Sequence, residues 1–331
     1  MNNTTLLVTG SAGHLGEALV RTLREQGRAV RGIDIVASPF TDAVGSIADR
    51  AFVRTQMSGI GAVLHAATLH KPHVGTHTRQ DFVDTNITGT LNLLEEAVAA
   101  KVSGFVFTST TSTFGRALTP PPGAPAAWIT EAVVPLPKNI YGVTKVAAED
   151  LCQLMQRLTG MPCIVLRTSR FFPEPDDDAE ARAARDPVNL QANEFLYRRV
   201  DIEDVVGAHL CALREAARIG FGRFIISATT PFLPEDAAEL GRDAVAVVRR
   251  RAPGWEEVYV QHGWTMAETF DRVYDNGAAR EQLGWRPRAD FAAVVERLHT
   301  TGDIRSDLAR TIGRKGYHPE RDAEPGAFPY R

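Results

Sequence analysis

Short apolar runs alternate with amphipathic stretches through the first half of the chain. The apolar runs have the length of buried strands, and the stretches between them repeat their apolar residues with helical spacing. In one such stretch Ile87, Leu91, Leu94 and Val98 fall on a single helical face. Strands that alternate with helices in this way predict a parallel sheet covered by helices on both sides. The predicted strands are residues 6–9, 29–35, 61–65, 105–109 and 163–166, and the predicted helices are residues 17–26, 86–100 and 141–158.

The alternation weakens after Arg167. Residues 171–189 contain three prolines and the acidic run 176–178, which is typical of a loop. Beyond them only a strand and helix over 199–214 and a strand at 224–227 are expected, and the remainder reads as helical or irregular. We therefore predict an α/β fold with a Rossmann-type doubly wound parallel sheet and a smaller C-terminal substrate-binding region. The predicted division is residues 1–170 with a return at about 197–228 for the sheet domain, 171–196 and 229–312 for the smaller region, and 313–331 for a tail.

Composition restricts the class of protein. The 331 residues carry a formal net charge of −3 and no long block of like charge, which disfavours a nucleic-acid partner. No apolar run reaches the ~18 residues that a membrane span needs, and the N-terminus does not resemble a signal peptide. Cys152, Cys163 and Cys211 are widely spaced and suggest no disulfide framework, so we expect a cytoplasmic protein with no membrane partner.

A glycine-rich turn follows the first predicted strand. Gly10, Gly13 and Gly16 have the spacing G-x-x-G-x-x-G, and a helix begins directly after them, with His14 and Leu15 inside the motif. Glycines let the backbone approach a pyrophosphate, and the free N–H groups of the helix start favour its negative charge. Asp34 ends the second strand 18 residues past Gly16, where a carboxylate accepts hydrogen bonds from ribose hydroxyls and repels a 2′-phosphate. The motif predicts a dinucleotide site that prefers NAD to NADP.

Tyr141 and Lys145 lie four residues apart on a predicted helix and therefore share one face. A phenol has a pKa near ~10, which is too high for a base at neutral pH. The lysine cation and the positive nicotinamide of NAD⁺ both favour the phenolate. We expect Tyr141 to exchange a proton with a substrate hydroxyl as hydride leaves or returns to the same carbon.

Hydroxyl side chains gather at residues 110–113, directly after the strand at 105–109. The carboxyl ends of strands in a doubly wound sheet face the ligand crevice. One of these hydroxyls is therefore placed to hydrogen-bond the substrate oxygen beside Tyr141.

Over roughly residues 5–298 the sequence resembles the extended short-chain dehydrogenase/reductases, in the NAD-dependent epimerase/dehydratase family. The glycines, Asp34, the pair Tyr141 and Lys145, the segment Leu283-Gly284-Trp285-Arg286-Pro287 and the run 200–205 match its motifs. The resemblance implies that Thr110, Tyr141 and Lys145 are catalytic and that helices 86–100 and 141–158 form a homodimer. It further implies a cofactor site made by Gly10, Gly13, His14, Leu15, Gly16, Asp34, Ser46, Ile47, His65, Ala66, Ala67, Asn86, Tyr141 and Lys145.

Several positions depart from the family pattern. Thr111 and Ser112 stand where the sugar-nucleotide dehydratases carry Asp-Glu, which argues against water elimination. Residues 167–173 replace the segment that carries a substrate-binding asparagine in family epimerases, and the usual phosphate-binding arginine motif is not evident. Candidate substrate contacts are His70, Lys71, Thr111, Arg170 and Arg272, the two arginines for a diphosphate or a carboxylate. His70, His73 and His77 also have a spacing that could suit a metal, but we expect polar substrate contacts and no metal.

These observations lead to one main expectation and two alternatives. The main one is an NAD-dependent enzyme that acts on a small molecule, a sugar or sugar derivative, and most specifically a nucleotide-sugar 4-epimerase. The first alternative is a dehydrogenase or keto-reductase of a smaller carbohydrate or hydroxy acid. The second is a non-catalytic, NAD-binding regulatory protein.

Overall fold

A computed structural model describes residues 4–174 and 186–315 of the chain. Its centre is a seven-stranded sheet in the order β3-β2-β1-β4-β5-β7-β8, in which every pair of neighbours is parallel. The order reverses between β1 and β4, so a crevice opens there at the carboxyl ends of the strands. The strands are β1 (Thr5–Thr9), β2 (Val30–Asp34), β3 (Ala43–Val44), β4 (Ile60–His65), β5 (Phe105–Thr110), β7 (Cys163–Thr168) and β8 (Phe221–Ile226).

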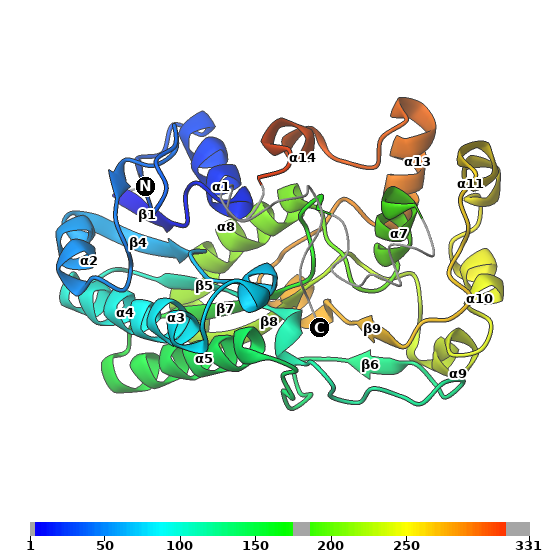
Figure 1. Ribbon diagram of the computed structural model, residues 1–331, viewed down its shortest axis with the longest axis horizontal. Helices are drawn as coiled ribbons and strands as arrows, with labels where there is room; N and C mark the ends of the chain where they lie inside the picture. Colours follow the sequence, from blue (N-terminus) through cyan, green and yellow to red (C-terminus); the bar gives the residue numbers. More distant parts are fainter. Residues whose placement is uncertain (1–3, 175–185, 316–331) are drawn as a thin grey trace.

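Helices cover both faces of this sheet (Figure 1). One face buries Leu6, Val8 and Val106 against α1 (His14–Glu25) and α8 (Ile202–Ile219). The other face buries alternate residues of the same strands, among them Leu7 and Phe105. It packs against α2 (Arg50–Met57), α4 (Gly89–Ala99) and α5 (Ile140–Thr159). Successive strand residues point to opposite faces, so the same continuous apolar strands supply the buried side chains of both layers.

A second core lies beyond the carboxyl ends of the strands, at the right of Figure 1. It includes a small parallel sheet in which β6 (Ala127–Ile129) pairs with β9 (Arg272–Tyr274). Aromatic residues such as Tyr259 and Phe291 fill its centre. Its helices are α7 (Pro187–Glu194), α9 (Ala237–Leu240), α10 (Ala244–Arg251), α11 (Glu256–His262) and α13 (Phe291–Thr301).

The remaining described elements are short. They are the 3₁₀ turns Lys71–Gly75, Thr111–Thr113 and Pro234–Asp236, the π-helical turn Val83–Thr88, and the helices α3 (Arg79–Phe82), α12 (Gly277–Gln282) and α14 (Asp307–Ile312).

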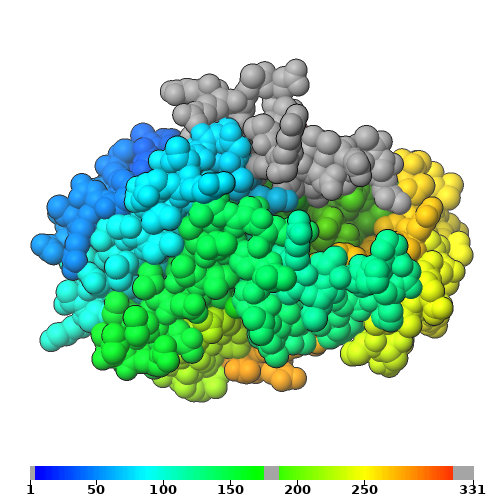
Figure 2. All heavy atoms as spheres, turned by 60° about the horizontal axis from the view of Figure 1, so that its bottom comes forward, coloured from blue at the N-terminus to red at the C-terminus, as the bar shows by residue number. Residues whose placement is uncertain are grey.

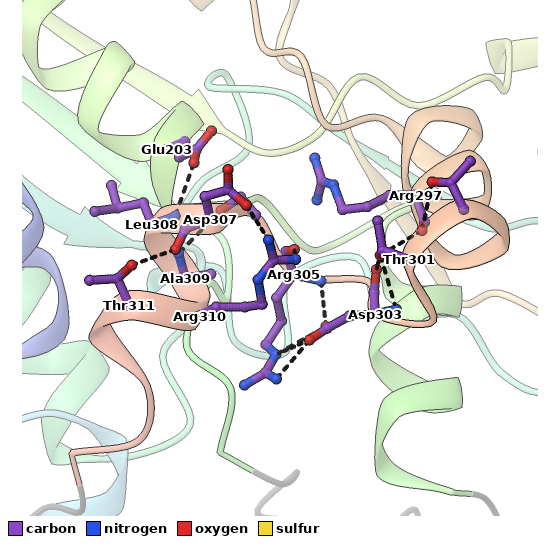
Figure 3. A network of polar contacts seen from close by, with 12 residues as sticks. Glu203, Arg297, Thr301, Asp303, Arg305, Asp307, Leu308, Ala309, Arg310 and Thr311 are labelled. Carbon is purple, nitrogen blue, oxygen red and sulfur yellow. Dashed lines mark hydrogen bonds and ion pairs between the residues drawn. The ribbon is translucent and has the colours of Figure 1, made fainter.

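Polar contacts anchor the segment between α13 and α14 (Figure 3). The Arg305 guanidinium donates to the Asp303 carboxylate at 2.7 Å, and the Leu308 amide donates to Glu203 Oε1 at 3.1 Å. Ser306 Oγ donates to Asp201 Oδ1 at 2.7 Å. Asp201 and Glu203 belong to the start of α8, so these contacts hold α14 against the sheet domain.

The structure corrects the predicted elements and division at several points. Residues 127–129 and 272–274 form strands, although neither was predicted, because a three-residue strand shows no recognisable alternation. The first of these lies between the two parts: Trp128 packs against the second core, whereas Ile129 packs with Ile225 of β8. Conversely, Ile312 of α14 and Leu283 after α12 pack in the α1–α8 core, not in the smaller region.

The other predicted helices and strands agree within a few residues, with two exceptions. The predicted helix 86–100 begins inside the π-helical turn, and the strand expected at the start of 199–214 is reduced to an isolated bridge between Arg199 and Arg170. Within the described residues, no helix is long and apolar enough to cross a membrane. The acidic run 176–178 and most of the predicted tail, from residue 316 on, lie outside the described residues.

Candidate active site

A cavity of about 770 Å³ opens at the carboxyl ends of the large sheet. It extends from the turn after β1 to the second core, with Gly13 at one end and Arg272 at the other. Between them its wall includes Asp34 after β2, Ala66 after β4 and Thr110 at the end of β5. The parallel sheet thus brings residues far apart in sequence to one edge. The volume is in the range of protein sites for small molecules.

The glycine turn is closed by backbone contacts that exclude larger side chains. Gly10 has φ +73°, a conformation that favours glycine. A Cβ on Gly16 would lie 1.8 Å from the Gly10 carbonyl oxygen, so the helix could not pack at this distance. At Gly13, the N-cap of α1, no side chain accepts a hydrogen bond from the first turn. The first-turn amides of His14, Leu15 and Gly16 therefore lack a side-chain cap and border the cavity, where they suit a pyrophosphate.

Two carboxylates border this turn. Asp34 lines the cavity at the end of β2, and its oxygens accept hydrogen bonds from Ala12 N at 2.9 Å and Val36 N at 3.0 Å. Glu174 pairs with His14 inside the protein, with 2.9 Å between His14 Nε2 and Glu174 Oε1. Burial raises the pKa of Glu174, but the hydrogen bond and charge of His14 keep it below its usual value. The Lys315 amide also donates to Glu174, so this carboxylate joins the glycine turn to the C-terminal segment.

Tyr141 and Thr110 meet at the cavity wall. Both side chains are buried, and both line the cavity. Burial raises the pKa of Tyr141 to about 12, against a hydrogen bond with Thr110 that lowers it. The phenol is therefore neutral at pH 7 in the protein alone, and the lowered pKa expected with NAD⁺ bound stays a prediction. A positive charge brought in by a bound group would shift the pKa in the required direction.

Lys145 lies one turn further along α5, beneath the cavity wall. Its Nζ donates to the Thr108 carbonyl at 2.7 Å and lies 4.0 Å from the centroid of the Phe107 ring. Burial lowers the pKa of this ammonium to about 7, although the Glu149 carboxylate raises it. Lys145 is thus fixed against β5, close to the catalytic segment but not on the wall of the cavity.

A buried ionic network supports this region from behind. Glu149 lies one turn after Lys145 and is fully buried. Its carboxylate accepts hydrogen bonds from Ser109 Oγ at 2.5 Å, Arg167 Nη2 at 2.7 Å and Arg223 Nε at 3.1 Å. These donors come from β5, β7 and β8, so one carboxylate ties α5 to three adjacent strands.

Comparisons with known proteins agree with this geometry. Residues 6–226 match the NAD dependent epimerase/dehydratase family. The chain belongs to this family. It is 32% identical to y4nG, an uncharacterized protein of Sinorhizobium fredii, over 98% of this chain and 86% of the relative. It is 27% identical to a UDP-glucose 4-epimerase of Streptomyces lividans, over 88% of this chain and 94% of the relative.

A solved structure shows the same fold with its cofactor. It is a short-chain dehydrogenase/reductase superfamily protein from Agrobacterium tumefaciens with bound NAD, 25% identical and with a TM-score of 0.61. The match covers 90% of this chain and 98% of that one. Membership of the family makes NAD the cofactor and places the chain among NAD-dependent epimerases and dehydrogenases.

The residues present fit NAD. The uncapped first turn of α1 suits the pyrophosphate, and Asp34 lies on the cavity wall where it can accept from ribose hydroxyls. Of the other residues expected at the cofactor, Ser46, Ile47, Ala66 and Ala67 also line the cavity.

Lys145 is one of three expected cofactor residues that lie behind the wall, and the other two are His65 and Asn86. The ring nitrogens of His65 contact Thr9 Oγ1 at 2.7 Å and Thr90 Oγ1 at 3.0 Å, and burial, with the charge of Lys145, holds the pKa of His65 well below 6.5. The Asn86 side chain is likewise hydrogen-bonded inside the protein. Its side-chain amide donates to the Leu69 carbonyl at 2.9 Å, and its side-chain oxygen accepts from the Leu69 backbone amide at 2.8 Å. Both side chains position neighbouring segments, so direct cofactor contact is not supported for either.

The expected substrate residues border the same cavity. His70, Lys71, Thr111, Arg170 and Arg272 all line it. His70 and His73 lie edge to face, with ring centroids 4.6 Å apart, and the His70 amide donates to His73 Nδ1. In residues 4–174 and 186–315, no group of three or more His, Cys, Asp or Glu side chains could hold a metal ion.

Several cavity residues were not predicted. Ser169 and Phe172 follow β7, and Lys138 and Asn139 precede α5. The position of residues 168–169 after a buried strand was a usable signal, since strand ends at this edge face the crevice. Lys138 had no such signal, because it precedes a helix and reaches the cavity only through tertiary packing.

Proposed function

We propose that this protein is a nucleotide-sugar 4-epimerase. The observation that carries the proposal is the chemistry beside Thr110 and Tyr141: hydroxyls of Thr111 and Ser112 line the wall there, where water elimination would need a carboxylic acid and a base. Of the described acids on the cavity wall, Asp34 is at the glycine turn, Glu194 binds Arg198 and Arg199, and Asp271 binds Arg272. Similarity to UDP-glucose 4-epimerases supports the same reaction class.

The side chains then have simple roles. Bound NAD supplies a reversible hydride acceptor for carbon 4 of the sugar. Tyr141 takes the proton of the carbon 4 hydroxyl as that carbon is oxidised, and returns it when hydride comes back to the opposite face. Thr110 hydrogen-bonds the same oxygen. Hydride and proton are both returned, so the sugar is inverted at one carbon without net oxidation.

One observation favours the alternative of a net dehydrogenase. Residues 167–173 contain no asparagine, and Arg170 and Phe172 line the cavity there. The substrate end therefore differs from that of the family epimerases, whereas Asp34, Thr110 and Tyr141 are kept. This combination suits hydride transfer on a different carbohydrate or on a hydroxy acid.

The deciding experiment follows absorbance at 340 nm in purified protein with NAD and a panel of UDP-, GDP- and dTDP-sugars and free uronic acids, with chromatography of the products. An epimeric product without accumulating NADH supports the epimerase. Steady NADH growth with one substrate refutes it in favour of the dehydrogenase. Tight NAD binding without turnover of any compound would contradict the proposed substrate class.

We further infer a homodimer formed through α4 and α5. Along α5 the apolar side chains of Val143, Leu154 and Leu158 are exposed, Leu158 by 72%. Figure 2 shows the green surface of α5 next to the cyan surface of the preceding helices, on one broad face of the molecule. Exposed apolar side chains along one helix are typical of a surface that a partner covers. The three free thiols suit a reducing, cytoplasmic location.

A further inference from the structure

The last described residues of the chain lie against the glycine turn. Helix α14 packs in the α1–α8 core through Ile312, and Gly313 ends it with φ +64°, a conformation that favours glycine. Ile312, Gly313 and His14 line one small cavity of about 30 Å³. The chain then reaches Lys315, which lines the large cavity together with His14. This segment lies beyond the last family motif, at residues 283–287.

Two buried carboxylates flank the first turn of α1. Glu17 belongs to this turn, and Glu174 pairs with His14 at 2.9 Å. The first-turn amides, which have no side-chain cap, suit the pyrophosphate of NAD, and this group is itself negatively charged. Charges interact strongly where water is excluded, so an uncompensated carboxylate at this turn would repel the cofactor.

Lys315 binds both carboxylates. Its ammonium pairs with Glu17 Oε2, and its backbone amide donates to Glu174 Oε1 at 3.1 Å. Glu17 has a second partner in Arg21, whose Nε donates to Glu17 Oε1 at 2.7 Å. Arg21 belongs to α1 itself, whereas Lys315 lies 298 residues beyond Glu17 in the sequence. The C-terminal segment thus brings a further positive charge to the buried carboxylate beside the pyrophosphate site.

We propose that Lys315 is a positioning residue for NAD: its ammonium compensates the charge of Glu17 and so allows the first turn of α1 to hold the pyrophosphate. Lys315 acts through Glu17 and not by contact with the phosphates, because its ammonium is engaged in the ion pair. The role concerns the phosphate groups and leaves the adenosine end of the cofactor, at Asp34, unaffected. It is the same for an epimerase and for a dehydrogenase.

The test compares two probes on the full-length protein freed of bound nucleotide. NAD binding is measured by isothermal titration calorimetry, and binding of adenosine, which has no phosphate, by nuclear magnetic resonance titration. Lys315→Met is expected to weaken NAD binding about 10-fold, because one buried carboxylate loses a counter-charge beside the phosphates. Adenosine affinity should stay at the wild-type value. Lys315→Arg, which keeps the charge, should retain most of the NAD affinity.

Glu17→Gln separates the effect of charge from that of structure. In the Lys315→Met background it removes the uncompensated carboxylate, so NAD affinity should return to within about 3-fold of wild type. A purely structural role of Lys315 would give no such rescue, because the double variant has lost both members of the ion pair.

Arg314→Met is the matched control, since this exposed neighbour carries the same charge and does not line the cavity. It should keep the wild-type NAD affinity. Unchanged NAD affinity in Lys315→Met, an equal loss in Arg314→Met, an equal loss of adenosine affinity, or no rescue by Glu17→Gln would each overturn the proposal. A fall in Tm that accounts for the lost NAD affinity of Lys315→Met would overturn it as well, because that result marks a structural role.

Discussion

At the scale of single residues, Tyr141 and Lys145 depend on their surroundings in opposite ways. Burial raises the pKa of the phenol to about 12 and lowers that of the ammonium to about 7, since a buried site disfavours the charged form of each. The phenol and the amine are thus each closer to the neutral form than the same side chains would be if exposed. Loading of the cofactor, with its positive ring, is what would favour the phenolate.

Tyr141→Phe is expected to lower kcat by about 10²- to 10⁴-fold, because the proton acceptor is lost while the ring still fills its place. NAD affinity and Tm should stay close to wild type, as measured by titration and thermal melting. Tyr259→Phe is the control: it removes a buried hydrogen bond to Asn193, neither residue lines the cavity, and it should cost about 1 kcal/mol of stability with kcat retained. Full activity of Tyr141→Phe would refute the proposed role.

Lys145→Met should change how stability depends on pH. The ammonium has a pKa of about 7 in the folded protein, against an ordinary value of 10.5 for an exposed lysine. Between pH 7 and 10.5 the unfolded chain keeps the proton on Lys145, whereas the folded chain releases it. This group therefore makes the folding stability of the wild type increase as the pH rises through that range. Relative to wild type, the methionine variant without cofactor should be most stable at and below pH 7 and should lose that advantage toward pH 10. Urea unfolding at pH 6, 8 and 9.5 measures this, and a constant difference would contradict it.

At the scale of elements, two tight connections decide where the site forms. The glycine turn between β1 and α1 has no room for a side chain at Gly16, and the Glu149 network joins α5 to three strands. Each connection can be tested against a nearby residue that is less tightly packed or more exposed, Gly13 for the turn and Asp150 for the network.

Gly16→Ala and Gly13→Ala should separate packing from cofactor binding. The added Cβ at Gly16 would meet the Gly10 oxygen at 1.8 Å, whereas at Gly13 the only neighbour within 4 Å is 3.3 Å away. Gly16→Ala is expected to cost about 1–3 kcal/mol of folding stability as an overpacked site. Gly13→Ala should nearly retain the wild-type Tm and act mainly on NAD affinity. Equal Tm losses in both variants would contradict the geometry of the turn.

Glu149→Gln should be strongly destabilising. It leaves the buried Arg167 guanidinium without its charged partner, which costs about 3–5 kcal/mol in comparable buried pairs. Asp150→Asn is the control, since this exposed carboxylate also pairs with Arg223 and such surface pairs contribute about 0–1 kcal/mol. Urea unfolding of both variants measures the difference, and a loss of similar size in each would mean that the network contributes little.

At the scale of the whole molecule, the sheet domain and the second core enclose one cavity. Residues at or directly after the carboxyl ends of β1, β2, β3, β4, β5 and β7 line it, and β9 adds Arg272 and Tyr274. The C-terminal segment returns to the glycine turn, where the Lys315 side chain pairs with Glu17. Cofactor binding should therefore stabilise the two cores together.

The proposed dimer is testable at this scale. Replacing Leu154 and Leu158 with glutamate places charge on the exposed face of α5, and light scattering should then show a monomer where the wild type shows a dimer. Val260→Glu is the control, since this valine is also apolar and 79% exposed but lies on α11, outside α4 and α5. A monomeric wild type would refute the dimer.

The sequence by itself determined the family, the order of the main strands and helices, the glycine turn with Asp34, and the pairing of Tyr141 with Thr110. These are local or short-period features, and the rule that parallel strands end at one edge then places them together. Tertiary structure alone decided that His65 and Asn86 lie behind the cavity, that β6 pairs with β9, and that Lys315 pairs with Glu17. The physical reason is that burial, pKa and the approach of side chains from distant segments depend on packing between elements, which no local pattern encodes.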